Sequence, residues 1–516
     1  MAKVMAVSDA VRAYIKDRMT VTFGGFIGAA HPEEVSLTIE QEFLETGSPN
    51  NLKLLYAAGM GDGKEKGLNH LGHEGLVSTV IGGHWGLVPK LQKLALENKI
   101  AAYNLPQGVI SQLYRDIASG KPGVITHVGL KTFVDPRLEG GKLNEKARQA
   151  GDIVELIHIH GKEKLFYSAI PVDVAVIRAT YADEHGNCTM EREGATLDAL
   201  AIAQAAKNSG GKVIVQVEQV VQFSSLDPRL VKIPGMLVDA IVVAKPENHM
   251  QTFGTHYNPA YSGEVKIPVD AIAPLPMDAR KVISRRAAME LVPNAIVNLG
   301  LGMPEGISAI TAEEGLSGMI LTAESGVIGG VPAGGLDFGV TANAECVVDQ
   351  AYQFDFYDGG GLDVAFLGMA EMDGQGNVNV SKFGVKIPGC GGFINITQNA
   401  KKVVFCGTFT AGGLKEDFCD GKLNILQEGR GKKLVEQVEQ VTFSGEYAKE
   451  KKQKVYYITE RAVFELTEQG VALIEIAPGT DLQKDILDQM NFAPIIGDVK
   501  LMDARLFRVE KMGLQL

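Results

Sequence analysis

A single carboxylate, Glu324, stands in the stretch AESGVIGG at residues 323–330, between an apolar run and a series of glycines. A charged side chain at the end of a predicted buried strand is unfavourable unless it has a function. A carboxylate needs no base at neutral pH to act as a nucleophile, and it can attack an activated acyl group to form a covalent intermediate. Glu324 is therefore a candidate catalytic nucleophile.

The glycines around Glu324 suit the second requirement of such chemistry. Attack on a carbonyl develops negative charge on oxygen, which fixed N–H donors must stabilise. Glycine lets the backbone approach closely and adopt positive φ. Glycine-rich segments follow at 326–335, 357–361 and 388–393. Tight turns are the structural alternative for these segments, and for residues 357–361 we favour it.

A dinucleotide site is another interpretation of the same region. The segment GLGMPEG at residues 300–306 lies between a predicted strand and a predicted helix, but its spacing is GxGxP and not GxGxxG. Glu324 lies 22 residues beyond Gly302 and would bind a ribose in this interpretation. The interpretation explains neither the glycines after Glu324 nor the internal repeat described below.

The remaining reactive side chains give weaker signals. His158 and His160, or His70 and His73, could bind a metal, but neither pair has an evident third ligand. A strand face and a helix surface are the expected places for them. Ser325 lacks the G-x-S-x-G frame of a hydrolase, and the five cysteines have no zinc-site spacing. The sequence therefore predicts no metal site.

The chain repeats itself, which indicates how these residues are positioned. A predicted helix, strand and glycine loop with a following proline begin near residue 9 and again near residue 278. An offset of 190 residues carries VDVAVIRATYADEHGN at 172–187 onto LDVAFLGMAEMDGQGN at 362–377 without gaps. The same offset carries KVIV at 212–215 onto KVVF. The shared register favours an ancient duplication.

The alternation of strands and helices predicts an α/β protein made of two duplicated open α/β domains with mostly parallel sheets. Four prolines between residues 255 and 277 suggest the break, so we expect an N-terminal half at 1–270 and a C-terminal half at 278–516 that carries Glu324. From residue 455 onward the pattern is typical of antiparallel strands. Ligands of open α/β sheets lie at the carboxyl ends of the strands, where Glu324 and both glycine loops fall.

Composition narrows the class of protein. A formal charge of −12 over 516 residues argues against nucleic acid or an anionic membrane as a partner. The sequence has neither a transmembrane stretch nor a secretory signal, and its five cysteines form no CxxC pair. We therefore expect a cytoplasmic enzyme.

Longer strings make the sequence resemble a known family. GGFIGAAHP at residues 24–32, TFVDPRLEGGKLN at 132–144, YQFDFYDGGGLD at 352–363 and YITERAVFEL at 457–466 are similar to the family I coenzyme A transferases, and most closely to the propionate/acetate CoA-transferase type with both halves fused. The family usually has Ser-Glu-Asn-Gly where this chain has Ala-Glu-Ser-Gly at residues 323–326, a departure shared with the propionate-type branch.

The resemblance assigns roles to several residues. Glu324 matches the glutamate that becomes a glutamyl-CoA thioester, while Gln107 and Gly392 match oxyanion donors from the two halves. The expected CoA-binding residues are Gly300, Gly302, Gly389 and Gly391. In the N-terminal half the position that matches Glu324 is Ala57 or Ala58. The site is therefore expected between the halves, with one working carboxylate.

The resemblance also implies an activity. CoA would move between a short-chain acyl-CoA, such as acetyl-CoA or propionyl-CoA, and a free short-chain carboxylate by a ping-pong mechanism. CoA would be substrate and covalent intermediate, with no permanently bound cofactor and no metal, and we expect a homo-oligomer. An acyl-CoA hydrolase on the same fold, an NAD-binding protein and a small-ligand sensor remain alternatives.

Overall fold

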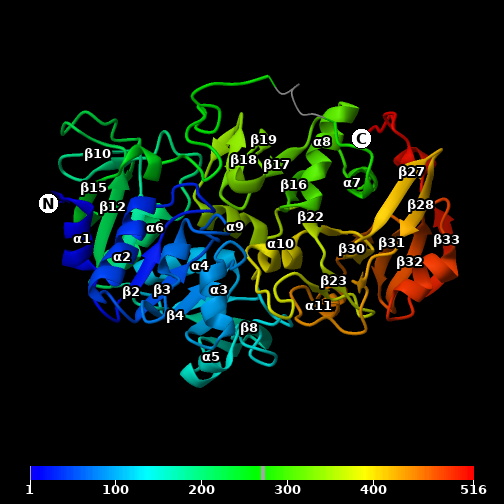
Figure 1. Cartoon of the computed structure of the whole chain (residues 1–516), viewed down its shortest axis with the longest axis horizontal. Coiled ribbons are helices and arrows are strands. Elements are labelled where there is room, and N and C mark those ends of the chain that lie inside the picture. Colours follow the sequence, from blue (N-terminus) through cyan, green and yellow to red (C-terminus); the bar gives the residue numbers. More distant parts are fainter. Residues whose placement is uncertain (1, 269–273) are drawn as a thin grey trace. The chain divides into compact units, whose positions relative to one another are not determined.

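The computed structural model describes residues 2–268 and 274–516. The chain divides into two compact units. Unit 1 consists of Met1–Ile267, Ala323–Asp355 and Phe383–Asn395, and unit 2 consists of Pro268–Thr322, Phe356–Lys382 and Ile396–Leu516. Figure 1 shows the elements of both units along the chain. Among the described residues, no helix is long and apolar enough to span a bilayer.

Unit 1 contains an eight-stranded sheet in which every pairing of neighbouring strands is parallel. In spatial order its strands are β1 (Lys3–Val4), β15 (Ala240–Val243), β12 (Lys212–Val217), β9 (Val174–Arg178), β2 (Thr20–Phe23), β3 (Leu52–Tyr56), β4 (Val77–Gly82) and β5 (Ala101–Asn104). The α-helices that lie wholly in this unit are α1 (Val7–Tyr14), α2 (Glu33–Thr46), α3 (Pro89–Leu96), α4 (Gln107–Ala118), α5 (Glu145–Ala150) and α6 (Ala199–Asn208). All five side chains of β9 are buried, as expected for a strand inside a parallel sheet.

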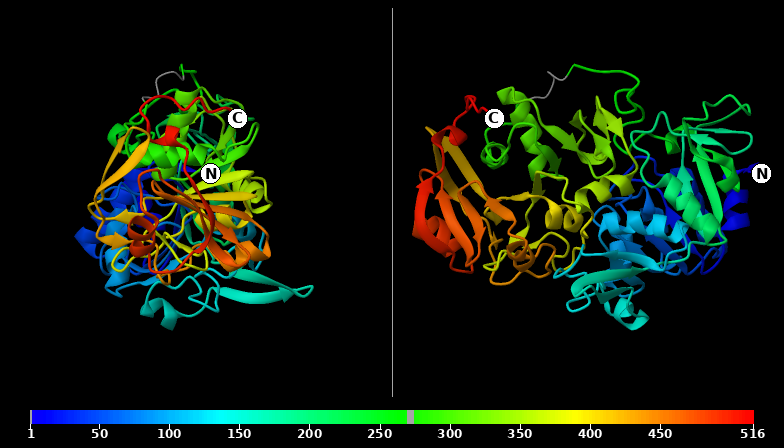
Figure 2. Two further views of the ribbon diagram at one scale, coloured as in Figure 1. Left: turned by 90° about the vertical axis from the view of Figure 1, so that its right-hand side faces the viewer. Right: turned by 180° about the vertical axis from the view of Figure 1, so that it is seen from behind.

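Smaller sheets complete unit 1. One contains β6 (Gly123–Thr126), β8 (Lys162–Ser168) and β7 (Val154–Ile159), and Figure 2 shows it beside α5 at the edge of the unit. Another contains β13 (Gln219–Val221), β10 (Tyr181–Asp183), β11 (Cys188–Thr189) and β14 (Val231–Ile233). Two antiparallel pairs follow Glu324 in the chain, β18 (Val327–Ile328) with β21 (Cys346–Val347) and β19 (Val331–Pro332) with β20 (Thr341–Ala342).

Unit 2 has its own large sheet. In spatial order the strands within this unit are β17 (Ile320–Thr322), β16 (Ile296–Leu299), β22 (Val364–Gly368), β25 (Lys402–Cys406), β30 (Lys454–Ile458), β31 (Ala462–Thr467), β32 (Gly470–Ile476) and β33 (Ile495–Leu501). The pairings are parallel from β17 to β30 and antiparallel from β30 to β32. The prediction of antiparallel strands after residue 455 is therefore confirmed.

The remaining elements of unit 2 are short. Three two-stranded ribbons consist of β23 (Glu371–Met372) with β24 (Val378–Asn379), β26 (Thr410–Ala411) with β29 (Gly431–Lys432), and β27 (Lys415–Cys419) with β28 (Lys422–Gln427). Its α-helices are α7 (Ala279–Ala288), α8 (Gly306–Glu314) and α11 (Gly445–Glu450). The helices α9 (Gln350–Asp358) and α10 (Phe393–Asn399) include residues of both units.

The repeated residues make the same hydrogen bonds in each unit. Asp173 accepts a hydrogen bond from the backbone N–H of Thr20 at 2.7 Å in unit 1, as Asp363 does from that of Ile296 at 2.9 Å in unit 2. These bonds connect the start of β9 to β2 and the start of β22 to β16. The 190-residue repeat therefore preserves the hydrogen bonds that fix two neighbouring parallel strands.

The second repeated aspartate organises a turn. Asp183 accepts from the side-chain amide of Asn187 at 2.9 Å, and Asp373 accepts from that of Asn377 at 3.0 Å. Each aspartate also accepts hydrogen bonds from backbone N–H groups of its own turn.

The prediction of an α/β protein with two mostly parallel sheets is confirmed.

The helix α1 begins at Val7, and Ala6 is its N-cap residue. The expected boundary between halves, after residue 270, falls within residues 269–273, outside the described residues. The division into halves at 1–270 and 278–516 stays a prediction.

Candidate active site

Glu324 lies in a tight turn between β17 and β18. The backbone N–H of Ala323 donates to the carbonyl of Val327 at 2.9 Å, and that of Gly326 donates to the carbonyl of Ala323 at 3.0 Å. Gly326 has a φ of +101°, and a Cβ there would lie 2.0 Å from the carbonyl oxygen of Val348. Glycine is therefore required at this position, and the turn presents Glu324 in one orientation.

The serine of the same turn has a structural partner. The Ser325 hydroxyl is buried and donates to the carbonyl oxygen of Gly339 at 2.6 Å. This bond occupies the hydroxyl proton and ties the turn to the segment before β20. The geometry leaves Glu324 as the reactive group of AESG.

The carboxylate of Glu324 is poorly solvated although part of the side chain is exposed. Its Oε2 atom is buried and has no hydrogen-bond partner among the residues that the structure describes. Burial raises the pKa of Glu324 to about 7, and the backbone N–H of Gly392 acts in the opposite direction. A carboxylate without a full set of donors is a stronger nucleophile than a hydrated one, because less solvation is lost on attack.

Gly392 approaches Glu324 so closely that no side chain fits between them. A Cβ on Gly392 would lie 2.1 Å from Oε2 of Glu324 and 3.1 Å from the ring of Phe354. The structure therefore brings together two of the residues that the sequence indicated, residues 324 and 392, both in unit 1.

The loop that carries Gly392 is attached to the ends of β4 and β5. The Asn104 side chain accepts from the backbone N–H of Cys390 at 2.9 Å and donates to the carbonyls of Gly82 and Gly83 at 2.8 and 2.6 Å. The backbone N–H of Gly391 donates to the carbonyl of Gly83 at 2.7 Å. One buried amide thus connects the two strand ends to the loop, at the edge of the sheet where α/β proteins place ligands.

Gln107 is buried at the start of α4 and contacts the same loop. Its backbone N–H donates to the carbonyl of Gly391 at 2.9 Å. Its side-chain Nε2 donates to Oε1 of Gln350 at 3.3 Å. The helix has Pro106 at its N-cap with no side-chain capping bond, so the Gln107 amide does not serve as a cap.

A buried polar network behind Gln107 was not found from the sequence. Nε2 of Gln350 donates to Oγ of Ser111 at 2.6 Å and to Oδ2 of Asp198 at 2.7 Å. Burial raises the pKa of Asp198 to about 7. Gln350 is thereby held so that its carbonyl oxygen faces Gln107. The arrangement joins segments that are far apart in the sequence, and no sequence motif marks it.

His84 is a second neighbour that the sequence did not single out. A Cβ on Gly391 would lie 3.7 Å from Cδ2 of His84 and 3.7 Å from Oε1 of Gln107. Burial lowers the pKa of His84 to about 4, so the imidazole is neutral at physiological pH. It adds no positive charge near the carboxylate.

The other predicted glycines fall in two places. Gly389 and Gly391 have φ values of +78° and +52° and lie in the loop with Gly392. Gly300 follows β16, where its N–H donates to the carbonyl of Phe366 at 2.8 Å, and Gly302 has a φ of +88° and precedes α8. Gly300 and Gly302 belong to unit 2, whereas Glu324, Gln107 and Gly392 belong to unit 1.

The histidines weighed as metal ligands have other partners. His70 hydrogen-bonds Glu33 at 3.0 Å, and His73 hydrogen-bonds Glu40 at 2.6 Å, with both glutamates on α2. His158 lies in the exposed part of β7. Within residues 2–268 and 274–516, no group of three or more metal-ligating side chains is arranged to hold an ion.

Two family models match the chain. The one described as coenzyme A transferase matches residues 4–244, and the one described as malonate decarboxylase, alpha subunit, transporter, matches residues 140–451. Among curated proteins, the caffeate CoA-transferase of Acetobacterium woodii is 50% identical over 100% of this chain and 99% of its own length. The acetate CoA-transferase YdiF of Escherichia coli K12 is 46% identical over 99% of this chain and 96% of its own.

Solved structures agree with the sequence matches. The acyl-CoA transferase YdiF of Escherichia coli O157:H7, solved as a thioester complex with CoA, has a TM-score of 0.94 and 45% identity, covering 100% of this chain and 98% of that one. Its apoenzyme gives a TM-score of 0.95 at 46% identity and the same coverage. At this identity over the full length, the chain belongs to the family I coenzyme A transferases, as a single-chain enzyme that transfers CoA between an acyl-CoA and a carboxylate.

Proposed function

We propose that this enzyme moves CoA between a short-chain acyl-CoA, such as acetyl-CoA or propionyl-CoA, and a free short-chain carboxylate, through a glutamyl-CoA thioester on Glu324. The observation that carries the proposal is the carboxylate of Glu324, whose Oε2 is buried without a hydrogen-bond partner among the described residues, beside the backbone of Gly392. No other described carboxylate combines a glycine turn of this kind with the loop at residues 388–393.

The first half-reaction forms an anhydride. The Glu324 carboxylate attacks the acyl-CoA carbonyl, the C–S bond breaks, and CoA leaves as thiolate. The thiolate then attacks the Glu324 carbonyl carbon of the acyl-glutamyl anhydride, and the first carboxylate leaves. The enzyme now carries CoA as a thioester on Glu324, and the energy of the thioester is conserved because no water has entered the sequence of steps.

The second half-reaction reverses these steps with another acid. The acceptor carboxylate attacks the glutamyl thioester, CoA thiolate leaves, and the thiolate attacks the acceptor's carbonyl in the new anhydride. Each addition places negative charge on a carbonyl oxygen. The N–H of Gly392, which already acts on the Glu324 carboxylate, and the second N–H of the Gln107 amide are the donors for this charge.

The names of two relatives mention different carboxylic acids. One is an acetate CoA-transferase at 46% identity and the other is a caffeate CoA-transferase at 50% identity. We favour short-chain acids because the longer sequence strings are those of the propionate/acetate type and because buried Phe354 stands close to the carboxylate. Acetate and propionate should give higher kcat/KM values than caffeate. A kcat/KM for caffeate tenfold above both would overturn this choice.

Sodium borohydride tests the covalent intermediate, because it reduces a thioester but not a carboxylate. The enzyme should lose activity when borohydride follows exposure to acetyl-CoA, and the free enzyme should survive the same treatment. Equal inactivation with and without acetyl-CoA would argue against a thioester. Rapid CoA release in the absence of any acceptor acid would favour an acyl-CoA hydrolase.

Replacing Gln107 with alanine should lower turnover by roughly 10²–10³, the usual loss for one oxyanion donor. Gln107→Glu should be worse, because a negative charge then faces the developing oxyanion and Glu324. CoA binding should change much less than turnover, since the donor acts when charge develops. Steady-state kinetics with acetyl-CoA and CoA titrations measure the two effects.

Gln350→Leu is the matched variant, since it removes the partner of the Gln107 amide but leaves the amide itself. Its turnover should fall less than that of Gln107→Ala. Near-normal turnover per folded molecule for Gln107→Ala, together with a lower melting temperature, would make Gln107 a structural residue and not a donor.

The pH dependence of thioester formation should report Glu324. The nucleophile is the ionised carboxylate, and burial raises its pKa to about 7. The rate of the first half-reaction should therefore be constant above about pH 7.5 and fall about tenfold per unit below pH 6.5. Rapid-quench measurement of acetate release from acetyl-CoA, with no acceptor acid present, gives the profile. A flat rate down to pH 5 would mean that Glu324 keeps the ordinary pKa of a glutamate.

A further inference from the structure

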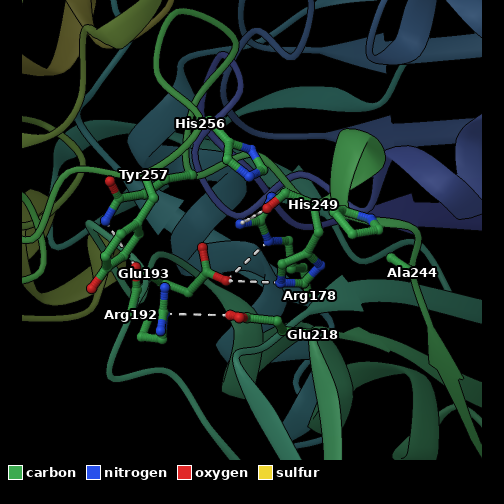
Figure 3. A pocket seen from close by; sticks show the side chains of 10 residues that line it. Arg178, Arg192, Glu193, Glu218, Ala244, His249, His256 and Tyr257 are labelled. Carbon is green, nitrogen blue, oxygen red and sulfur yellow. Dashed lines mark hydrogen bonds and ion pairs between the residues drawn. The ribbon is translucent and has the colours of Figure 1, made fainter.

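Unit 1 has a pocket at the carboxyl ends of three neighbouring parallel strands. Arg178 ends β9, Glu218 follows β12, and Ala244 follows β15. Together with Arg192, Glu193 and side chains of the following loop between Pro246 and Tyr257, they line a cavity of about 120 Å³, and Figure 3 shows the lining side chains. This edge is where open α/β sheets bind ligands. The chemistry proposed for Glu324 uses none of these residues.

A buried ion pair fixes one wall of the pocket. Nε of Arg178 donates to Oε1 of Glu193 at 2.9 Å, and both side chains are almost fully buried, at 3% and 2% exposure. The same guanidinium donates to the backbone carbonyls of His249 and Met250. Each of the three nitrogens of Arg178 thus makes a hydrogen bond, and only one of the two carboxylate oxygens of Glu193 is bonded to Arg178.

The protonation of His249 follows from its neighbours. Oε1 of Gln216 accepts from the backbone N–H of Glu34 at 2.9 Å, which turns the amide nitrogen of Gln216 towards His249. That nitrogen donates to Nδ1 of His249 at 3.2 Å. Burial lowers the pKa of His249 to about 2, so the ring is neutral. Nδ1 must accept, and the proton is on Nε2.

Three buried polar atoms of the pocket have no hydrogen-bond partner among the residues that the structure describes: Oε2 of Glu193, Nε2 of His249 and Nε of Arg192. The last of these lies 3.4 Å from the carboxylate of Glu218, whereas the first two lie next to each other. Nε2 of His249 lies 3.7 Å from Oε1 of the Glu193 carboxylate, so the acceptor and the donor are adjacent. Figure 3 shows the second oxygen of Glu193 without a dashed line. Leaving such groups unpaired is unfavourable, and a ligand that pairs both would recover this cost.

The opposite wall is flat. The guanidinium of Arg192 lies over the ring of Tyr257 at 4.0 Å, and its Nε is 3.4 Å from Oε2 of Glu218. Burial raises the pKa of Glu193, and the charge of Arg178 acts in the opposite direction. With both glutamates ionised, their charges balance those of the two arginines, and burial keeps His249 neutral. A ligand for this pocket is therefore neutral and planar, with a donor and an acceptor side by side on one edge.

We propose that this pocket binds an adenine ring. The exocyclic amino group of adenine donates to Oε2 of Glu193, and the neighbouring ring nitrogen accepts from Nε2–H of His249. The ring face lies against the layer formed by Arg192 and Tyr257, as bases stack on aromatic and guanidinium planes. Adenine is part of CoA, the substrate of this family, and of free adenine nucleotides, so the same chemistry has two sources.

Calorimetric titration of the full-length protein with adenosine tests the proposal. Adenosine should bind at one site per chain. Purine riboside lacks the amino group and leaves Glu193 unmatched, so its Kd should be roughly tenfold to a hundredfold higher. Equal affinity for the two nucleosides, or no binding of adenosine up to millimolar concentration, would overturn the proposal.

Variants of the pocket locate the binding. Glu193→Gln should raise the Kd for adenosine at least tenfold. It should also reduce the difference between the Kd values for adenosine and purine riboside. Because loss of this carboxylate can unfold the chain through Arg178, the partly exposed Tyr257 gives a second variant, Tyr257→Leu, which should also weaken binding. Asp227→Asn, which alters an exposed ion pair with Arg229, is the matched control and should bind normally. Unchanged binding in folded Tyr257→Leu and Glu193→Gln would place the adenosine elsewhere.

Competition separates the two sources of adenine. If the pocket receives the adenine of CoA, adenosine competes with CoA for binding to the apoenzyme, and Tyr257→Leu raises the KM for acetyl-CoA. If it receives a free nucleotide, adenosine and CoA bind together. The adenosine titration and the competition with CoA should be repeated with Glu324→Ala, since adenosine binding does not depend on the proposed nucleophile. Failure of the Glu324 mechanism would then leave this result intact, and the reverse also holds.

Discussion

Replacing Glu324 with alanine is expected to abolish CoA exchange, with turnover reduced by roughly 10⁴ or more, because the residue that forms the covalent bond is missing. The Ser325 hydroxyl cannot replace it, since its proton is used in a bond to Gly339. Exchange between acetyl-CoA and labelled propionate measures the loss. Activity within tenfold of the unmodified enzyme would remove Glu324 from the mechanism.

The raised pKa of Glu324 predicts how the stability of a Glu324 variant should compare with that of the unmodified enzyme. The pKa of Glu324 is raised to about 7 in the folded protein, so between about pH 4.5 and pH 7 the folded state binds more protons than the unfolded state. The contribution of this group to stability is thus lost as the pH rises through 7. Glu324→Gln, which cannot ionise, should melt at or above the temperature of the unmodified enzyme at pH 8 and should remain inactive.

Gly392→Ala is expected to lower turnover by roughly 10²–10³, although the change adds only one methyl group. The new Cβ would lie 2.1 Å from Oε2 of Glu324 and 2.9 Å from its Cδ, so either the carboxylate or the loop at residues 388–393 must move. Either movement separates the N–H of residue 392 from the developing oxyanion. Steady-state turnover with acetyl-CoA and acetate or propionate measures the effect.

Gly497→Ala is the matched control, because a Cβ at that glycine has no heavy atom within 4 Å. It lies in β33, and its turnover should be within twofold of normal. Normal turnover for Gly392→Ala would show that the close approach of residue 392 to Glu324 has no role in the reaction.

Much of the fold could be predicted from the sequence because its signals are local or repeated. The buried run at 174–178 and the run at 212–217 form adjacent parallel strands, and their counterparts 190 residues later do the same. The repeated aspartates explain why the register survived. Asp173 and Asp363 each fix one strand to its neighbour, so substitution would break a bond between strands.

The candidate site was predictable only in part. Glu324 could be identified locally, because a carboxylate followed by glycines is unusual after an apolar strand. The roles of Gln107 and Gly392 came from the resemblance, since residues 107, 324 and 392 are linked by folding and not by spacing. Gln350 and His84 were missed because their significance depends on neighbours more than 20 residues away in sequence.

The adenine pocket shows the same limit. Each of its residues is unremarkable in the sequence, and His249 is one of ten histidines. Its importance arises because its Nε2 atom and a neighbouring carboxylate oxygen both lack a hydrogen-bond partner among the described residues. Only folding brings these two atoms together.

Mass spectrometry of the protein after incubation with acetyl-CoA alone shows directly whether Glu324 carries CoA. We expect a mass increase equal to CoA less one water per chain, on the peptide that contains AESGVIGG, and its disappearance on addition of propionate. Glu324→Gln, treated in the same way, should gain no mass. An unmodified protein, or CoA attached to a peptide without Glu324, would rule out a CoA thioester on Glu324.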